Sequence, residues 1–146
     1  TSQRLRDERL PADGLAFTAL SKSGRVIGTL RMWNVIAGSA GPALLLGPLA
    51  VDGRYQRRGI GRELMTHALN MAKVLGHASV LLVGDEPYYS RYGFTRSLVA
   101  DLHLPGPVER GRFLGVELAP GALDGAEGLV MASGALAPAV GKTLAA

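Results

Sequence analysis

Two glycines, Gly59 and Gly61, stand between a nearly all-apolar run (43–51) and a stretch of helical periodicity that begins at Ile60. The first turn of a helix has backbone N–H groups without intrahelical partners and carries a partial positive charge. Glycine has no side chain that would keep a ligand away from those groups. Four arginines within 54–62 add guanidinium groups, whose planar shape suits phosphate. The sequence therefore predicts a strand, a phosphate-binding turn and a helix, in that order.

The apolar pattern before these glycines predicts three strands. Alternating and β-branched apolar residues indicate strands at 15–20 and 25–33 with a hairpin turn between them. Residues 35–42 contain two glycines and a proline and are predicted to form a loop. The run 43–51 is typical of a strand covered on both faces. Its Gly47–Pro48 pair predicts a bulge, where the strand bends or parts from a neighbour.

The pattern after the glycines predicts a helix followed by further strands. The helix should end at Gly76, and one of its faces is apolar: Ile60, Leu64, Ala68, Met71 and Leu75. Residues 79–83 form a short buried strand, so the strand–helix–strand order predicts a parallel pair. A short helix is expected at 88–92. Weaker strand patterns follow at 112–118 and 128–131.

The length of 146 residues corresponds to one domain, which we expect to span residues 1–146. Hydrophobic residues make up 47% of the chain and charged residues 19%, a composition typical of globular proteins. The longest apolar run, 43–51, is shorter than the ~18 residues that a membrane span needs. The polar, charged start of the chain is unlike a signal peptide. We therefore expect a cytoplasmic protein without a membrane partner.

The charged residues and the potential metal ligands indicate which classes of ligand the chain can bind. Cysteine is absent and the three histidines lack the spacing of metal ligands, so no metal site is expected. The formal net charge is +4, with thirteen arginines and three lysines. Because the arginines gather at 54–62 and do not spread along a face, a small polyanion fits better than a nucleic acid.

The motif Gln56-x-x-Gly59-x-Gly61 at the strand-to-helix junction resembles the acetyl-coenzyme A signature of GNAT-type N-acetyltransferases. Three further features occur in the family's order: the strand end 49–51, the strand 79–83, and an aromatic-Tyr-x-x-x-Gly-Phe segment at 88–94. The resemblance covers about residues 15–100. The later stretch Leu118-Ala119-Pro120-Gly121-Ala122-Leu123 is similar to the tail of the YhbS-like branch of predicted acetyltransferases.

The resemblance implies an α/β (α+β) GNAT fold with a mixed central sheet that is splayed at the cofactor cleft. It implies direct transfer of an acetyl group from acetyl-coenzyme A to an amine of a small molecule or a protein, through a tetrahedral intermediate. The family positions carried over as cofactor-binding are Leu49, Ala50, Val51, Gln56, Arg57, Arg58, Gly59, Ile60, Gly61 and Arg62.

Two residues are implied to be catalytic. A backbone amide at the strand end, with Val51 as the candidate, would stabilise the oxyanion. Tyr89 occupies the family's general-acid position and would protonate the leaving thiolate; the alternative is a helix-face aromatic that covers the core. Tyr88 is expected to pack. The general base is not assigned, because the carboxylates at 52, 85 and 86 also fit turn or capping roles and water could serve instead.

Some features differ from the family or from competing motifs. The family usually has a strand and two helices before the hairpin, whereas about fourteen residues precede Leu15. These helices are therefore expected to be missing or truncated, either because the chain is a fragment or because part of it was not recorded, which leaves the acceptor undefined. The Rossmann fingerprint does not fit, because it requires glycine or alanine at the position of Leu64. The P-loop motif, which would end at 141–143, does not fit either, because its first glycine is replaced by Leu136. A non-catalytic acyl-coenzyme A-binding module is the alternative function. Both a monomer and a homodimer are compatible with the sequence.

Overall fold

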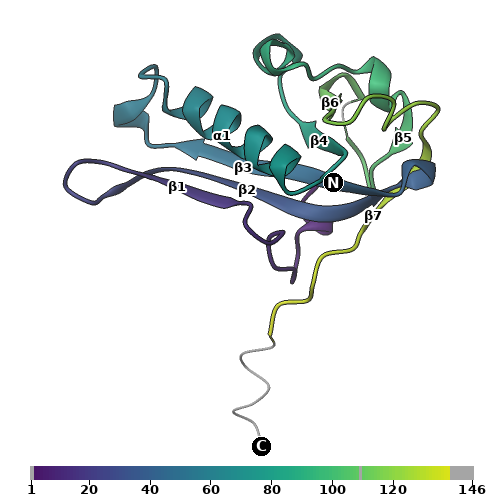
Figure 1. Cartoon of the computed structure of the whole chain (residues 1–146), viewed down its shortest axis with the longest axis horizontal. Helices are drawn as coiled ribbons and strands as arrows, with labels where there is room; N and C mark the ends of the chain where they lie inside the picture. Colours follow the sequence, from purple (N-terminus) through teal and green to yellow (C-terminus); the bar gives the residue numbers. More distant parts are fainter. Residues whose placement is uncertain (1, 109, 139–146) are drawn as a thin grey trace, which may run out of the picture.

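The computed structural model describes residues 2–108 and 110–138, in which seven strands form one mixed sheet (Figure 1). The sheet order is β5-β7-β2-β3-β4-β6, with β1 paired to β2. Strands β3 and β4 pair in parallel, as do β5 and β7, and the other pairs are antiparallel. In chain order the elements are β1 (Ala16–Leu20), β2 (Val26–Ala37), β3 (Pro42–Val51), α1 (Ile60–Val74), β4 (Ser79–Val83), α2 (Glu86–Tyr89), β5 (Asp101–His103), β6 (Phe113–Glu117) and β7 (Glu127–Ala132).

The prediction of a loop over 35–42 was wrong in part. Strand β2 continues to Ala37 and β3 already begins at Pro42, so only a short turn, Gly38–Ala40, and Gly41 connect them. Val35 and Ala37 are fully buried, and the burial of these apolar side chains favours the strand over the loop. Gly38 has φ +50°, and a Cβ there would overlap the backbone of β7, so the turn requires glycine.

The predicted bulge in β3 is confirmed. Residues Gly47 and Pro48 lie opposite one residue of β2, because the register moves from Leu46–Met32 to Leu49–Leu30. The indole Nε1 of Trp33 donates a hydrogen bond of 2.5 Å to the Gly47 carbonyl and holds the bulge in place.

Beyond the bulge, β3 and β4 separate. The parallel pairing predicted for these strands is confirmed, but it comprises only Leu44–Val80 and Leu45–Leu81. The β4-facing edge of β3 is consequently without a paired strand among the described residues from Leu46 to Val51. The sheet is therefore splayed, as the resemblance implies.

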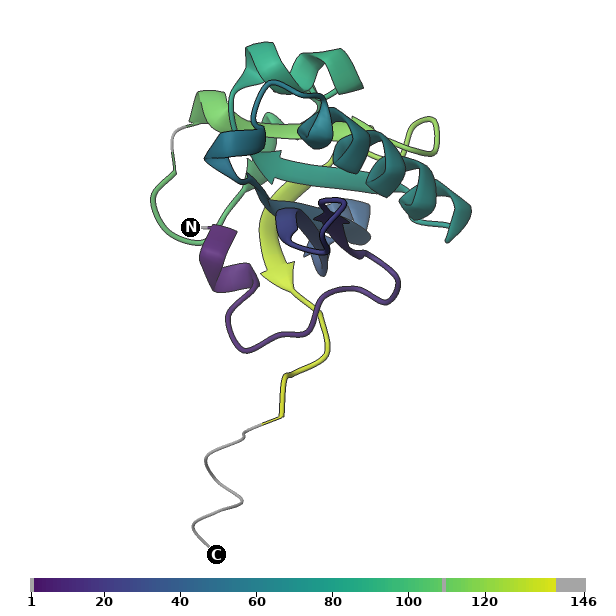
Figure 2. The same ribbon diagram turned by 90° about the vertical axis from the view of Figure 1, so that its left-hand side faces the viewer.

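The sheet has a core on each face. Helix α1 covers one face, and the N-terminal residues lie on the other (Figure 2). Alternation along β3 sends Leu44 and Leu46 towards α1 and Leu45 towards the opposite core, so the strand is covered on both faces up to Leu46, as predicted. Beyond Leu46 the prediction was wrong, because Pro48 and Ala50 are exposed. Leu5, at 2% exposure, anchors the N-terminal residues in that opposite core. Among the described residues before β1, the only helical element is a 3₁₀ turn, Ser2–Leu5, and no α-helix is present.

Helix α1 buries Leu64, Met65, Ala68 and Ala72. The predicted apolar face is thus correct near its centre, but Leu75 is 49% exposed because the helix has already ended at Val74. The end has the hydrogen bonds of a Schellman motif: the Gly76 amide donates to the Lys73 carbonyl and the His77 amide to the Ala72 carbonyl.

The Gly76→Ala variant should be less stable by about 1 kcal/mol, because Gly76 has φ +88° and an L-residue is strained there. A Cβ would meet no atom within 4 Å, so the loss would come from the backbone alone. Urea unfolding measures it. Gly53→Ala is the control, since Gly53 also faces open space but has no positive φ; equal stability of the two variants would contradict the explanation.

The remaining predictions concern short or terminal segments. The short helix near 88–92 is present but begins earlier, as α2 continued by a 3₁₀ turn, Ser90–Tyr92, and the two weaker strands are confirmed as β6 and β7. The tripeptide 141–143 lies outside the described residues. No helix of the described chain has the length and apolarity needed to cross a membrane. One domain over residues 1–146 stays a prediction.

Candidate active site

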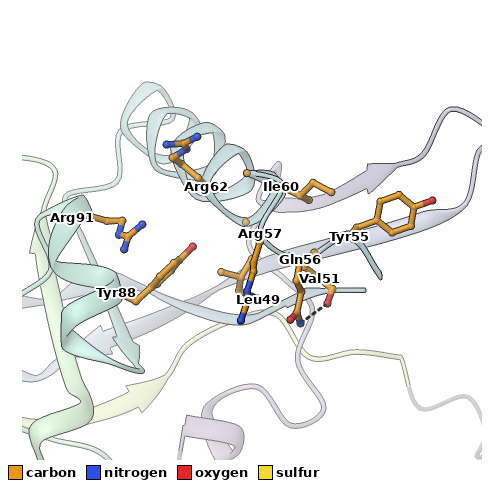
Figure 3. A pocket seen from close by; sticks show the side chains of 11 residues that line it. Leu49, Val51, Tyr55, Gln56, Arg57, Ile60, Arg62, Tyr88 and Arg91 are labelled. Carbon is orange, nitrogen blue, oxygen red and sulfur yellow. Dashed lines mark hydrogen bonds between the residues drawn. The ribbon is translucent and has the colours of Figure 1, made fainter. Parts of the chain in front are cut away.

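A cleft of about 540 Å³ opens where β3 ends and α1 begins (Figure 3). The residues that line it come from the end of β3, the connection to α1, the first turn of α1, and the α2 region across the cleft. They are Leu49, Val51, Tyr55, Gln56, Arg57, Gly59, Ile60, Gly61, Arg62, Tyr88 and Arg91.

Of the residues expected to bind the cofactor, all line the cleft except Ala50 and Arg58. The side chain of Ala50 is exposed and belongs to a different surface, beside Gly28 and Thr29 of β2. The guanidinium of Arg58 lies 5.2 Å from the centroid of the Tyr55 ring, outside the cleft.

The start of α1 presents backbone amides without protein partners. No side chain caps the helix, and its first hydrogen bond runs from the Glu63 amide to the Gly59 carbonyl, 3.0 Å. The amides from Gly59 to Arg62 donate no hydrogen bond to another described residue. Arg57 and Gly59 both have positive φ, +66° and +82°, which turns successive amides towards one side. An anion fits here.

Two guanidinium groups beside this helix start are available to such an anion. Arg57 and Arg62 line the cleft and form no ion pair within the described chain, unlike Arg54, which pairs with Asp52 at 3.3 Å. In Figure 3 the Arg62 side chain projects from the first turn of α1 on the side of Tyr88 and Arg91. The start of the helix is therefore both uncapped and positively charged.

The end of β3 offers a second set of donors. The Asp52 amide donates to the Ile27 carbonyl of β2 at 2.8 Å. Because amide directions alternate along a strand, the amide of Ala50 also faces β2, whereas those of Leu49 and Val51 face the splayed edge. The Val51 carbonyl accepts a bond of 3.3 Å from Gln56 Nε2 (Figure 3). An extended ligand could therefore pair with this edge.

Tyr88 and Arg91 line the cleft, although the sequence reasoning assigned packing to Tyr88 and no role to Arg91. The Tyr88 hydroxyl lies 3.2 Å from that of Tyr92, and the Arg91 guanidinium lies 4.7 Å from the centroid of the Tyr88 ring. Burial, the hydrogen bond shared with Tyr88 and the electrostatic interaction with Tyr88 raise the pKa of Tyr92 to about 12. The sequence carried one signal that could have identified this pair: Tyr88 and Arg91 are three residues apart, which places both on one side of a helical turn.

Tyr89 lies beside a second cavity of about 260 Å³ and does not line the cleft. Its ring packs over Gly84 and contacts Phe94 edge-on, with ring centroids 6.1 Å apart. Burial, and then the neighbouring Tyr88 and Asp85, raise the pKa of Tyr89 above its ordinary value. The phenol is therefore protonated at neutral pH.

The second cavity lies at the splay, between the bulge of β3 and the end of β4. Leu49 is common to this cavity and to the cleft, so the two spaces meet at the unpaired strand edge. Its residues are Ser2, Arg6, Leu45, Leu46, Gly47, Pro48, Leu49, Leu82, Val83 and Tyr89.

The carboxylates considered as bases are engaged elsewhere. Hydrogen bonds from Arg54 lower the pKa of Asp52, and Asp85 pairs with Arg112 at 2.5 Å. Glu86 accepts a bond of 3.3 Å from the Arg96 amide. None of the three lines the cleft or the second cavity, and no group of three potential metal ligands occurs within the described chain.

Comparisons with known proteins bear on this site. Residues 13–96 match a family described as the acetyltransferase (GNAT) domain. The chain is 34% identical over 117 residues to the uncharacterized N-acetyltransferase YhbS of Escherichia coli K12, covering 80% of this chain and 70% of that protein.

Two solved structures are similar. One is YhbS from Escherichia coli in complex with CoA: the TM-score is 0.72 and the identity 31%, over 90% of this chain and 73% of that one. The other is a GNAT family acetyltransferase from Brucella melitensis in complex with acetyl-CoA: the TM-score is 0.63 and the identity 26%, over 82% and 66%. The predicted resemblance, its YhbS-like branch included, is confirmed by these matches, as is the predicted fold. This chain belongs to the GNAT family of N-acetyltransferases.

Proposed function

We propose that this enzyme transfers the acetyl group of acetyl-coenzyme A directly to an amine, with the pyrophosphate bound at the start of α1. The observation that carries the proposal is the uncapped, glycine-flanked first turn of α1, beside an unpaired edge of β3. The two relatives in complex with CoA and acetyl-CoA support the choice of ligand. The amides from Gly59 to Arg62, with Arg57 and Arg62, are proposed to hold the diphosphate.

The pantetheine arm is proposed to run along β3. An extended chain with amide groups can pair with a free strand edge, as in β-strand addition. The amides of Leu49 and Val51 face that edge. This would direct the thioester to the place where the cleft and the second cavity meet.

In the proposed reaction the neutral amine nitrogen attacks the thioester carbonyl carbon. A C–N bond forms and the carbonyl oxygen becomes an oxyanion, for which the Val51 amide is the proposed donor; losing such a donor typically costs ~3 kcal/mol. The carbonyl then re-forms as the C–S bond breaks, and Tyr89 donates its proton to the thiolate. The positively charged nitrogen loses one proton, which returns through water to the Tyr89 phenolate. An amine of pKa ~10 must first lose a proton, which costs about 4 kcal/mol at pH 7, and water is the proposed acceptor of that proton. The products are the N-acetyl amine and free coenzyme A.

The first test is a thermal-shift titration with acetyl-coenzyme A, followed by a panel of amines monitored for free thiol. Stabilisation by the ligand and amine-dependent thiol release are expected. Binding without thiol release from any amine would favour the non-catalytic binding module. Absence of binding would contradict the proposal. A cytoplasmic location, the oligomeric state, and the absence of nucleic-acid and membrane partners stay predictions.

The Arg62→Gln variant should bind coenzyme A about tenfold more weakly, equal to ~1.4 kcal/mol, because it loses a guanidinium beside the proposed diphosphate. Isothermal titration at two salt concentrations measures this, and the variant should depend less on salt. Arg58→Gln is the matched control, since Arg58 lies outside the cleft. An equal loss of coenzyme A affinity in both variants would mean that the net charge of the protein, and not a contact of Arg62 with the diphosphate, explains the effect.

A further inference from the structure

The second cavity differs in character from the cleft that we assign to the cosubstrate. Six of its ten lining residues are leucine, proline or valine of β3 and β4, but polar atoms form the larger part of its exposed surface. The polar side chains among its described residues are those of Tyr89, Ser2 and Arg6, and none of those residues is acidic. Among the described residues that line the second cavity, Arg6 is therefore the one with a formal charge, and that charge is positive.

Arg6 is held beside the cavity by the N-terminal turn. Its amide donates to the Gln3 carbonyl at 3.0 Å, and the preceding residue, Leu5, is buried in the core. The Arg6 side chain is partly buried, yet its guanidinium makes no hydrogen bond or ion pair with another described residue. A partly desolvated guanidinium is stabilised best by an anion, and its planar N–H groups can donate two parallel hydrogen bonds to one carboxylate.

We propose that the second cavity takes an amine acceptor that also carries a carboxylate, with Arg6 binding that carboxylate. The inference rests on the proposed function, because it names the acceptor class of the same transfer. The cavity volume of about 260 Å³ equals roughly nine water molecules at ~30 Å³ each, which fits a small amino acid. A polyamine would instead meet a positive charge and no carboxylate among the described lining residues.

The test compares acceptors that carry a carboxylate with analogues in which another group replaces it: L-leucine with L-leucinamide, and 4-aminobutanoate with 1,4-diaminobutane, with rates expressed per concentration of neutral amine. In the thiol-release assay, kcat/KM should be at least tenfold higher for the acceptor with the carboxylate in each pair. Arg6→Gln should raise KM for L-leucine about tenfold and abolish the preference, with KM for acetyl-coenzyme A unchanged. Arg6→Lys should retain part of the preference, because the charge remains.

Arg4→Gln is the matched control, since Arg4 is exposed in the same turn and lines neither cavity. Thermal shift with acetyl-coenzyme A shows that each variant is folded. A preference for the amide or the diamine, or for a protein amine over every amino acid, would overturn the inference, as would an unchanged preference in Arg6→Gln.

Calorimetric binding of L-leucine and L-leucinamide to the protein saturated with coenzyme A separates the two proposals. Binding that depends on the carboxylate and on Arg6, without thiol release, would refute the transfer reaction and support the ligand class. Thiol release at equal rates from both members of each pair would support the reaction and refute the ligand class.

Discussion

Replacing Gly61 with leucine is expected to weaken acetyl-coenzyme A binding by roughly a hundredfold or more, equal to about 2.7 kcal/mol. A Cβ at this position would lie 3.3 Å from the Tyr88 hydroxyl and 3.8 Å from Val51 Cγ2, so the rest of a leucine side chain would fill the cleft in front of the helix amides. Gly61 has ordinary helical backbone in the first turn of α1, where leucine is a better helix former. The variant should therefore fold while losing the ligand.

Isothermal titration measures this loss, and thermal unfolding without ligand verifies the fold. Gly53→Leu is the matched control, because Gly53 lies on the same connection between β3 and α1 but faces open space. Wild-type affinity in Gly61→Leu would remove the argument for a diphosphate site at this helix start.

Replacing Tyr89 with phenylalanine is expected to lower kcat by about a hundredfold while the dissociation constant of acetyl-coenzyme A stays unchanged. The substitution removes one hydroxyl and keeps the ring contacts with Gly84 and Phe94. A general acid acts in its protonated form, and the raised pKa of Tyr89 keeps that form dominant from pH 7 to beyond pH 9. Wild-type kcat should accordingly show no alkaline decline from Tyr89 in this range.

Pre-steady-state thiol release at saturating acceptor measures the chemical step directly. Tyr92→Phe serves as the control, because its hydroxyl contacts only that of Tyr88 in the described chain and lines neither cavity. If Tyr89→Phe and Tyr92→Phe turned over equally fast, Tyr89 would be a packing residue, the alternative that the sequence left open.

Local chemistry explains why much of the fold could be predicted from the sequence. The bulge at Gly47–Pro48 and the helix end at Gly76 each depend on the backbone limits of those residue types, which act within a few positions. Longer-range pairing was harder to anticipate. The end of β2 is a strand because β3 and β7 pair with its two edges, although the glycines and the proline at 38–42 favoured a loop. The three-residue β5 is a strand because β7 pairs with it.

The candidate site likewise combines residues that local sequence identifies with residues that only the folded chain brings together. Residues 56–62 were identified because they are contiguous and carry one motif. Tyr88 and Arg91 were missed because the fold brings them across the cleft. Ala50 was included only as part of a continuous strand end, although strand alternation directs its amide to β2. Arg6 could not be foreseen, since the second cavity joins the N-terminal turn to β3 and β4.

The central claim is that the uncapped amides at the start of α1 hold a diphosphate and so place the thioester beside Val51. A crystal structure of this chain with acetyl-coenzyme A tests it most directly. We predict diphosphate oxygens within hydrogen-bond distance of the amides from Gly59 to Arg62, and the thioester oxygen facing the Val51 amide. A complex in which those amides bond to protein atoms while the coenzyme lies elsewhere would contradict the account.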